Sequence, residues 1–394
     1  MTKSKAHKFI LPAGIGLGCT WFSSHCGSGF ATGKSFMQYF GQFGWTSVWT
    51  PVVAFAIIGV ATYIMLEFCR HIKAQHYKDF AAEFYTPNIP VTRRIFILFW
   101  DFLGVSGALI GAGATFAAIG ELVSQYLNLP YFVGVGIGVL LIILVTVFGA
   151  KVMIRFATTL SVCLIILILA VSIAGLANGS GDLGKVLGER MVGEGYSFWD
   201  AYIAPGPVYA AVQMSNVNYL IALSGTLITK KDVKTTAVFG AALNVVMMLC
   251  LGLMVLSYFP ALNNESMPVV TALSYVNQPI LTVLYQLMLF FALVTTGATI
   301  VTNVVSRFCV FGAQYVPSEP LRRAILTVVL VALGIWLSSF GFSAVLVTGY
   351  NFLGSLAGPV ILLPILILGP YRLYQIKKRE AGNTVAASEP ATPS

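Results

Sequence analysis

The chain has 394 residues, of which 57% are hydrophobic and only 9% are charged, and its mean hydropathy is +0.85. A soluble domain carries about 25% charged residues, so this composition leaves too little polar surface for a soluble fold. It excludes a cytoplasmic enzyme, a nucleic-acid-binding protein and a disordered chain. The net charge of +9 is then attributed to basic loop residues that set the orientation of membrane helices.

Apolar runs near or above about 20 residues recur along the chain, which is the length that spans a bilayer as a helix. Barrel strands would instead alternate over about ten residues, and that pattern does not dominate here. The sequence therefore predicts an all-α integral membrane protein with ten transmembrane helices. Their expected ranges are 9–43, 45–69, 93–127, 131–149, 152–177, 199–228, 233–259, 279–310, 322–340 and 342–374.

The basic residues are distributed unevenly over the predicted loops. If the N-terminus is inside and ten spans alternate, only Lys34, Lys185 and Arg190 fall on the outer half, which leaves 20 of the 23 basic residues inside. Cytoplasmic loops of membrane proteins are enriched in Lys and Arg. We therefore expect a multi-pass protein of the cell membrane with both termini cytoplasmic.

The ten spans divide the chain into two halves of five. Residues 1–8 form a cytoplasmic N-terminus, 9–177 the first half, and 178–198 an outer loop. Residues 199–374 form the second half, and 375–394 a polar tail that we expect to be disordered and cytoplasmic.

Two loops carry amphipathic or apolar segments. Residues 71–85 fit a short amphipathic helix on the inner surface. The segment Met267–Val276 is apolar but too short to span a membrane. It is either a surface loop or a lid that dips into an outer vestibule.

The first predicted span contains a polar stretch from Ser23 to Gly29, with glycines at 27 and 29. Each Gly weakens a helix by about 1 kcal/mol relative to Ala. Hydrocarbon cannot satisfy the backbone groups of an unwound helix, so an unwound stretch should line a protein-enclosed or water-filled space. Close packing of small residues is the alternative, but it does not require Ser, Ser and His beside the glycines.

The sixth predicted span is interrupted in a similar way. Pro205-Gly206-Pro207 disfavours regular helix, and polar residues follow from Gln213 to Asn218. The two interrupted spans are an odd number of crossings apart, so they enter the membrane from opposite sides. Such a pair indicates a transporter site at the midplane. We expect residues around 24–29 and 209–218 to be non-helical and to face each other across a cavity.

The segment CGSGFATGKSFMQYF, which begins at Cys26, resembles the G-x-G-F-A-S-G-x-E-x-x-Q-F-F signature of the YkvI-type membrane proteins. That family belongs to the amino acid–polyamine–organocation superfamily. The resemblance implies a LeuT-type 5+5 inverted repeat with discontinuous helices 1 and 6. This chain departs from the signature at Ser35, where the family often has an acidic residue, so no role of that acid is carried over.

The eighth predicted span places two adjacent hydroxyls, Thr295 and Thr296, shortly after Ala292. Sodium is a hard cation and prefers oxygen ligands. The spacing resembles the second sodium site of LeuT-type symporters, in which an Ala carbonyl and two hydroxyls join carbonyls of the first helix break. The resemblance places those carbonyls on Ser23 and Cys26. The alternative is that the hydroxyls simply bond to their own helix backbone.

We expect the substrate site to be formed by the two breaks and the facing part of the third helix. Backbone amides of residues 27–29 would suit a carboxylate, and aromatic rings would hold an apolar or cationic part. The predicted lining residues are Trp21, Phe22, Ser24, His25, Gly27, Ser28, Gly29, Ser106, Tyr209, Gln213 and Asn216.

Ionisable groups inside membrane spans often have a functional role. His25 either contacts the substrate or a proton, or is a neutral histidine with satisfied hydrogen bonds. Lys34 would compete with a cation, attract an anion or pair with Glu121. Asp101 and Glu67 would pair with basic residues near the inner helix ends, the choices being Arg155, Arg70 and Arg94.

The chain has no Walker motif, so no ATPase partner is indicated and an ion gradient should drive transport. We expect an ion-coupled secondary active transporter of a small polar organic solute, an amino acid or a related amine. Sodium is the expected coupling ion and the proton the alternative. No organic cofactor and no nucleic-acid partner are expected, and the partners are the solute and the lipid bilayer. A solute sensor like the germinant-receptor subunits stays open, whereas four His residues offer little for a membrane enzyme.

Overall fold

The computed structural model describes residues 12–85, 89–147, 150–310 and 312–388. Six helices in this part are long and apolar enough to cross a membrane. They are α4 (Thr50–Ile72), α6 (Pro90–Leu127), α12 (Lys230–Leu256), α14 (Pro279–Phe308), α15 (Glu319–Ser338) and the run Phe342–Lys378 of α16 (Phe342–Ala357), η5 (Gly358–Leu362) and α17 (Leu363–Ser388). Two more helices, α7 (Tyr131–Val147) and α8 (Ala150–Asn178), contain shorter apolar runs.

The other two predicted spans are broken. The first is divided into α1 (Ala13–His25), α2 (Ser28–Ala31) and α3 (Lys34–Tyr39), followed by the turns η1 (Gly41–Phe43) and η2 (Trp45–Val48). The sixth consists of the π-helical η3 (Trp199–Ile203), then α10 (Pro205–Met214), α11 (Asn218–Leu223) and the turn η4 (Ser224–Thr226). With the eight helices above, they account for the ten predicted segments in chain order.

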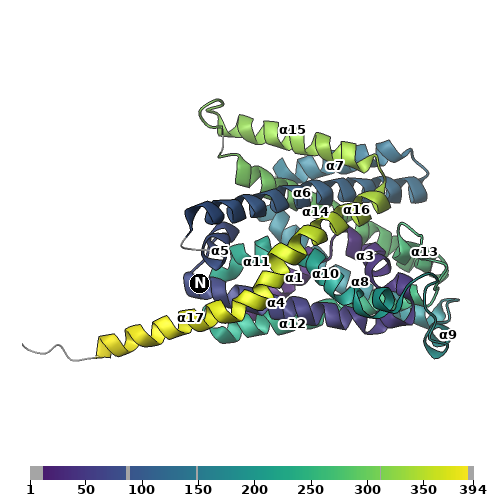
Figure 1. Ribbon diagram of the computed structural model, residues 1–394. Coiled ribbons are helices and arrows are strands. Elements are labelled where there is room, and N and C mark those ends of the chain that lie inside the picture. Colours follow the sequence, from purple (N-terminus) through teal and green to yellow (C-terminus); the bar gives the residue numbers. More distant parts are fainter. Residues whose placement is uncertain (1–11, 86–88, 148–149, 311, 389–394) are drawn as a thin grey trace, which may run out of the picture.

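The broken segments lie between two groups of long helices (Figure 1). On one side, α6 packs against α14, α15 and α16. On the other side, α12 packs against α1, α4 and α8, while α10 contacts both α4 and α16. The helices α5 (Tyr77–Phe84) and the end of α17 lie at one end of the molecule, whereas α9 (Leu183–Gly188) and α13 (Pro268–Ser274) lie at the other (Figure 1).

The segment expected to be an amphipathic surface helix folds as α5. Its Phe80 and Phe84 are fully buried and pack edge-on against Phe68 of α4, and Phe80 also contacts Trp100 of α6. The apolar face is therefore covered by protein rather than by lipid.

The apolar loop segment forms α13, and it is a buried lid rather than a surface loop. Val269 and Leu273 are fully buried. The Val269 backbone N–H donates to the Thr32 carbonyl between α2 and α3 at 3.0 Å. The lid thus contacts the outer half of the first broken segment directly.

The C-terminal boundary differs from the expected one. Helix α17 runs to Ser388, whereas the sequence predicts a disordered tail from residue 375. Lys, Arg, Glu and Ala between 377 and 387 are good helix formers, and no Pro follows Pro370 before Pro390, so the helix continues. Residues 1–11, which include the predicted N-terminal segment 1–8, and residues 389–394 lie outside the described residues.

The orientation is testable with single cysteines in a variant that lacks the native ones. We expect a cysteine at the exposed position Lys231 to react with a membrane-impermeant maleimide only in inside-out vesicles. A cysteine at the exposed Lys185 should react only in right-side-out vesicles. Labelling of position 231 from outside would contradict the assigned orientation.

Candidate functional site

The first broken segment is interrupted twice. Helix α1 ends at His25, Cys26 and Gly27 are non-helical, and α2 begins at Ser28. The break is shorter than the predicted stretch from 24 to 29. A second interruption falls at Gly33, whose φ of +81° is a left-handed conformation that Gly adopts without strain. A side chain there would also collide with Val269 of the lid, since an added Cβ would lie 2.6 Å from its Cγ2.

The second broken segment is interrupted at Ser215–Val217, between α10 and α11. Pro205-Gly206-Pro207 were expected to be irregular but are helical, because α10 begins at Pro205; the interruption lies just before them, at Ala204, where the π-helical η3 ends. Proline is compatible with the first turn of a helix, where its fixed φ is helical and its missing N–H is not needed. Residues 209–214 are therefore helical, and only the three residues after them match the expected non-helical stretch.

His25 connects three helices at the end of α1. Its Nδ1 lies 2.5 Å from the Oδ1 of Asn244 on α12, and its Nε2 lies 2.5 Å from the hydroxyl of Tyr209 on α10. The Asn244 amide nitrogen donates to the Gly240 carbonyl at 2.8 Å, so its carbonyl oxygen is the group that faces His25. Neutral His25 with its proton on Nδ1 then donates to Asn244 and accepts from Tyr209. This arrangement matches the neutral, satisfied histidine among the two expected alternatives.

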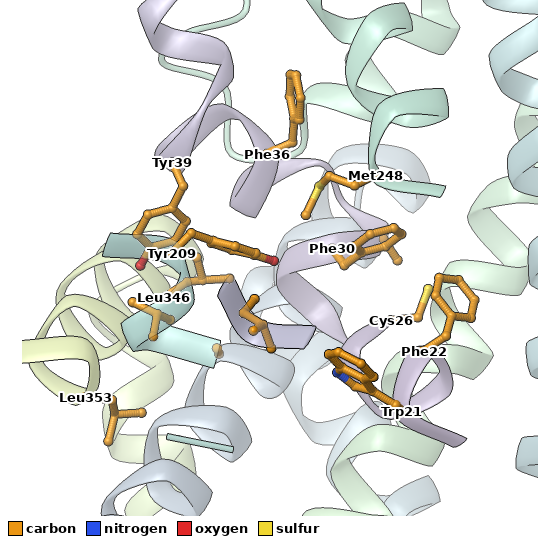
Figure 2. Close-up of a cluster of buried hydrophobic side chains, with 14 of the residues drawn as sticks. Trp21, Phe22, Cys26, Phe30, Phe36, Tyr39, Tyr209, Met248, Leu346 and Leu353 are labelled. Atoms are coloured by element: carbon orange, nitrogen blue, oxygen red, sulfur yellow. The ribbon is translucent and has the colours of Figure 1, made fainter. Parts of the chain in front are cut away.

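Aromatic rings enclose this hydrogen-bonded group. The His25 ring meets Phe30 and Phe55 edge-on, with ring centroids 5.0 and 5.3 Å apart. Tyr209 lies against Tyr39, at 5.2 Å between centroids, and points into the core (Figure 2). His25 is half-buried, and these rings cover part of it, which limits the access of water to its hydrogen bonds on these sides.

Trp21 and Phe22 belong to this core rather than to a solvent-accessible wall. Both are almost completely buried (Figure 2). Trp21 packs closely on Gly240 of α12. A Cβ added to Gly240 would lie 2.4 Å from the Trp21 ring. Phe22 meets Phe30 edge-on. In this conformation neither ring is placed to contact a solute.

Exposure along the first broken segment changes at the break. All residues from 28 to 37 are buried, and the lid α13 contacts this stretch at Thr32 and Gly33. On the other side of the break, Ser24 is exposed and Ser23 and Gly27 are half-buried. Asn216 in the turn between α10 and α11 is exposed, and Ser106 and Gln213 are half-buried. The predicted site is therefore closed toward α13 and accessible from the opposite side.

Side-chain contacts bring the predicted site residues together. Ser24 hydrogen-bonds Tyr219 of α11, and Ser28 hydrogen-bonds Tyr350 of α16. A Cβ added to Gly107 of α6 would lie 3.7 Å from the Asn216 Oδ1. Because His25 and Tyr209 touch directly, the two broken segments meet in a side-chain contact at that point rather than across a cavity.

The backbone of Gly27 is already engaged. Its N–H donates to the His25 carbonyl at 2.8 Å, so it does not point to a carboxylate in this conformation. Gly29 is fully enclosed, and an added Cβ would lie 2.3 Å from the Ser35 Oγ. The amides of residues 27–29 thus do not form the exposed carboxylate site that the sequence suggested.

The expected sodium ligands lie beside the first break. A Cβ added to Gly27 would lie 3.6 Å from the Thr296 Cγ2, while Ala292 and Thr295 are buried. The Thr295 hydroxyl lies 3.0 Å from the carbonyls of both Phe291 and Ala292, which is the helix back-bonding of the alternative prediction. A hydroxyl that donates its proton still has lone pairs for a cation. At the end of α1, Cys26 has lost the helical continuation that would occupy its carbonyl.

Two ion pairs fix the end of the molecule that carries α5. Asp101 of α6 pairs with Arg307 of α14 at 2.9 Å, and the Tyr77 hydroxyl hydrogen-bonds both. The expected partners of Asp101 were nearer in sequence, so this assignment was wrong. Burial raises the pKa of the Tyr77 phenol, which keeps its hydroxyl protonated as a donor. Glu67 pairs with Arg70 at 2.9 Å, as expected.

Lys34 is buried at the start of α3 and donates to the Glu265 carbonyl, next to the lid, at 2.9 Å. Glu121 lies near enough to interact electrostatically, but its Oε1 accepts from the Phe342 backbone N–H at 3.0 Å. Lys34 therefore joins the first broken segment to the lid, and its interaction with Glu121 is a longer-range one.

Comparison with solved structures identifies the fold. The chain is similar to a Na+-coupled sialic acid symporter in its substrate-bound outward-open state, with 15% identity, a TM-score of 0.62 and 91% of this chain and 79% of that chain covered. It is also similar to Mhp1 in an inward-facing conformation, with 14% identity, a TM-score of 0.64 and coverage of 88% and 75%. MhsT in complex with L-phenylalanine gives 14% identity, a TM-score of 0.60 and coverage of 92% and 97%.

These similarities show that the chain has the LeuT-type fold, with ten membrane helices in two halves and broken first and sixth helices. No protein-family model matches the chain, and no curated protein matches it by sequence. The YkvI-type resemblance therefore stays a prediction.

The hydrogen bonds of His25 predict a stability difference between two variants. Asn244→Leu leaves a buried His25 N–H without an acceptor, which should cost about 1–3 kcal/mol and lower the melting temperature clearly. Tyr209→Phe removes the hydroxyl that donates to the His25 Nε2. This nitrogen can stay unprotonated without a donor, so the loss of stability should be smaller. Thermal unfolding of the purified variants in detergent measures both. Equal melting temperatures for Asn244→Leu and the native protein would contradict the assigned hydrogen bonds.

Proposed function

We propose that this protein is an ion-coupled secondary active transporter of a small polar organic solute, an amino acid or a related amine, that works by alternating access. The observation that carries the proposal is the pair of broken segments, which contact each other through His25 and Tyr209 inside a LeuT-type fold. Discontinuous helices at the midplane are where transporters of this architecture bind solutes and coupling ions. The similar structures include a Na+-coupled sialic acid symporter and MhsT in complex with L-phenylalanine, which supports an organic solute.

The accessibility of the site supports an inward-facing conformation. With the basic loops on the cytoplasmic side, α5 and the end of α17 face the cytoplasm and α13 faces outward. The site is sealed below α13 and exposed at Ser24 and Asn216, so a solute would enter or leave from inside.

Sodium is the coupling ion that we propose, held by the hydroxyls of Thr295 and Thr296 and the carbonyls of Ala292, Ser23 and Cys26. The proximity of Gly27 to Thr296 supports it, because the break and α14 would have to share the ion. Proton coupling through His25 is less favoured. The groups packed around His25 are Asn244, Tyr209 and aromatic rings, so a bound proton would add a charge with no carboxylate among these neighbours.

Replacing both Thr295 and Thr296 by Ala should remove most of the sodium dependence of solute binding. The coupling between an ion and a solute is typically 1–3 kcal/mol, which corresponds to roughly 5–150-fold in solute affinity. Thermal-shift titrations of the purified protein with amino acids and amines, in sodium and in potassium, measure this factor. By linkage, saturating solute should tighten sodium binding by the same factor.

Thr299→Ala is the matched control, because its hydroxyl donates to the Thr295 carbonyl at 2.8 Å one turn further along α14. It should leave the sodium dependence unchanged. Solute binding that is equal in sodium and potassium but changes strongly between about pH 5.5 and 7.5 would contradict sodium coupling and favour a proton, since unperturbed His titrates in that window.

A further inference from the structure

The segments that meet at the two breaks carry polar but uncharged side chains. The ranges 20–29, 104–112, 213–219, 292–299 and 346–350 contain no Asp, Glu, Lys or Arg. They contain hydroxyls and carboxamides instead, together with His25, whose hydrogen bonds fit its neutral form. A solute between these segments would meet hydrogen-bonding groups but no Asp, Glu, Lys or Arg side chain.

The charged groups nearest in sequence to these segments already have protein partners. Asp101 is paired with Arg307 at 2.9 Å. Lys34 donates to the Glu265 carbonyl, and Glu121 accepts from the Phe342 backbone. Lys34 is itself one of the buried residues 28–37 and bonds next to the lid, and Glu121 lies near enough to interact with it electrostatically. A charged solute would therefore have to break existing interactions to gain a counterion.

Asn216 is placed to contact a solute. Its backbone N–H donates to the Gln213 carbonyl at 3.1 Å, which fixes the turn between α10 and α11. Its side chain is exposed, and no hydrogen-bond partner for it is found among the residues that the structure describes. The missing side chain of Gly107 lets the carboxamide lie close to α6. A carboxamide offers two donors and one acceptor oxygen, and it carries no charge.

We propose, on the basis of the transport function above, that the site selects polar solutes without net charge and that the Asn216 carboxamide hydrogen-bonds their uncharged polar group. The physical reason is desolvation. A charged group beyond the carboxylate and ammonium that every amino acid carries would lose solvation that hydroxyls and amides only partly replace, whereas a neutral polar side chain is satisfied by matched hydrogen bonds.

The first test compares solutes of similar shape and different charge. Purified protein in sodium is titrated with L-glutamine and L-serine, L-glutamate and L-aspartate, and L-lysine and agmatine, with the melting temperature as readout. Glutamine has a side-chain amide where glutamate has a carboxylate, and the two are of similar size. The pair therefore tests the effect of side-chain charge alone. We expect at least one neutral solute to raise the melting temperature and the four charged solutes to raise it less or not at all. A charged solute that binds as well as the best neutral one overturns the inference.

The second test introduces a carboxylate at the break. Asn216→Asp should lose affinity for the neutral solute and bind lysine or agmatine at least tenfold more tightly than the native protein, because a hydrogen bond between charged groups is stronger than a neutral one. Asn128→Asp makes the same change at the exposed end of α6 and should alter neither affinity. An unchanged solute preference in Asn216→Asp contradicts the role of Asn216.

Flux separates this inference from the transport proposal. In proteoliposomes, movement of lysine but not of glutamine would overturn the charge selectivity and leave transport standing. Binding of glutamine without any movement would overturn transport and leave the selectivity standing. If none of the six solutes binds, both the amino-acid assignment and the inference fail.

Discussion

The structure depends on how a helix can be interrupted inside a membrane. Breaking α1 at Cys26 and Gly27 releases backbone groups that lipid cannot hydrogen-bond, so the surrounding protein must enclose the break. The chain does this with His25, the last residue of α1, which hydrogen-bonds α10 and α12 at once. The same contact brings the two broken segments together, so the feature that stabilises the break also builds the site.

The two sides of this contact differ in packing, and that difference underlies the proposed mechanism. On the side of α13, the residues from 28 to 37 are buried, the lid bonds to Thr32, and Lys34 bonds to Glu265. On the opposite side, Ser24 and Asn216 are exposed. Alternating access requires that these two arrangements exchange around a fixed site. In that exchange the lid contacts and the Lys34 hydrogen bond would have to break.

Much of the fold was predictable because each membrane span corresponds to a long apolar run in the sequence. The ten segments, the two interruptions and the short apolar lid segment were all visible in the sequence. The predicted non-helical stretch 209–218 contains the observed break at 215–217, but residues 205–214 are helical, because proline fits the first turn of a helix and Pro205 begins α10. The partner of Asp101 was also not predictable, since Arg307 lies more than two hundred residues away and only the packing of α6 against α14 brings them together.

Burial distinguishes the predicted site residues that a solute could reach from those in the core, whereas their residue types do not. Trp21 and Phe22 look like substrate contacts in a sequence, yet they pack against α12 and Phe30. Asn216 and Ser24 are less distinctive, but they are exposed next to the breaks. The local sequence pattern predicts where a helix is interrupted. Which residues near the interruption are exposed depends instead on how helices that are far apart in the sequence pack against each other.

Solute flux under an ion gradient tests the central claim most directly. Purified protein is reconstituted in proteoliposomes with potassium inside, and uptake of a radiolabelled solute that binds is followed with sodium or potassium outside. The account predicts accumulation above the equilibrium level that depends on the inward sodium gradient and collapses when a sodium ionophore dissipates it. Binding of the solute without any gradient-driven accumulation would contradict the account and favour a sensor.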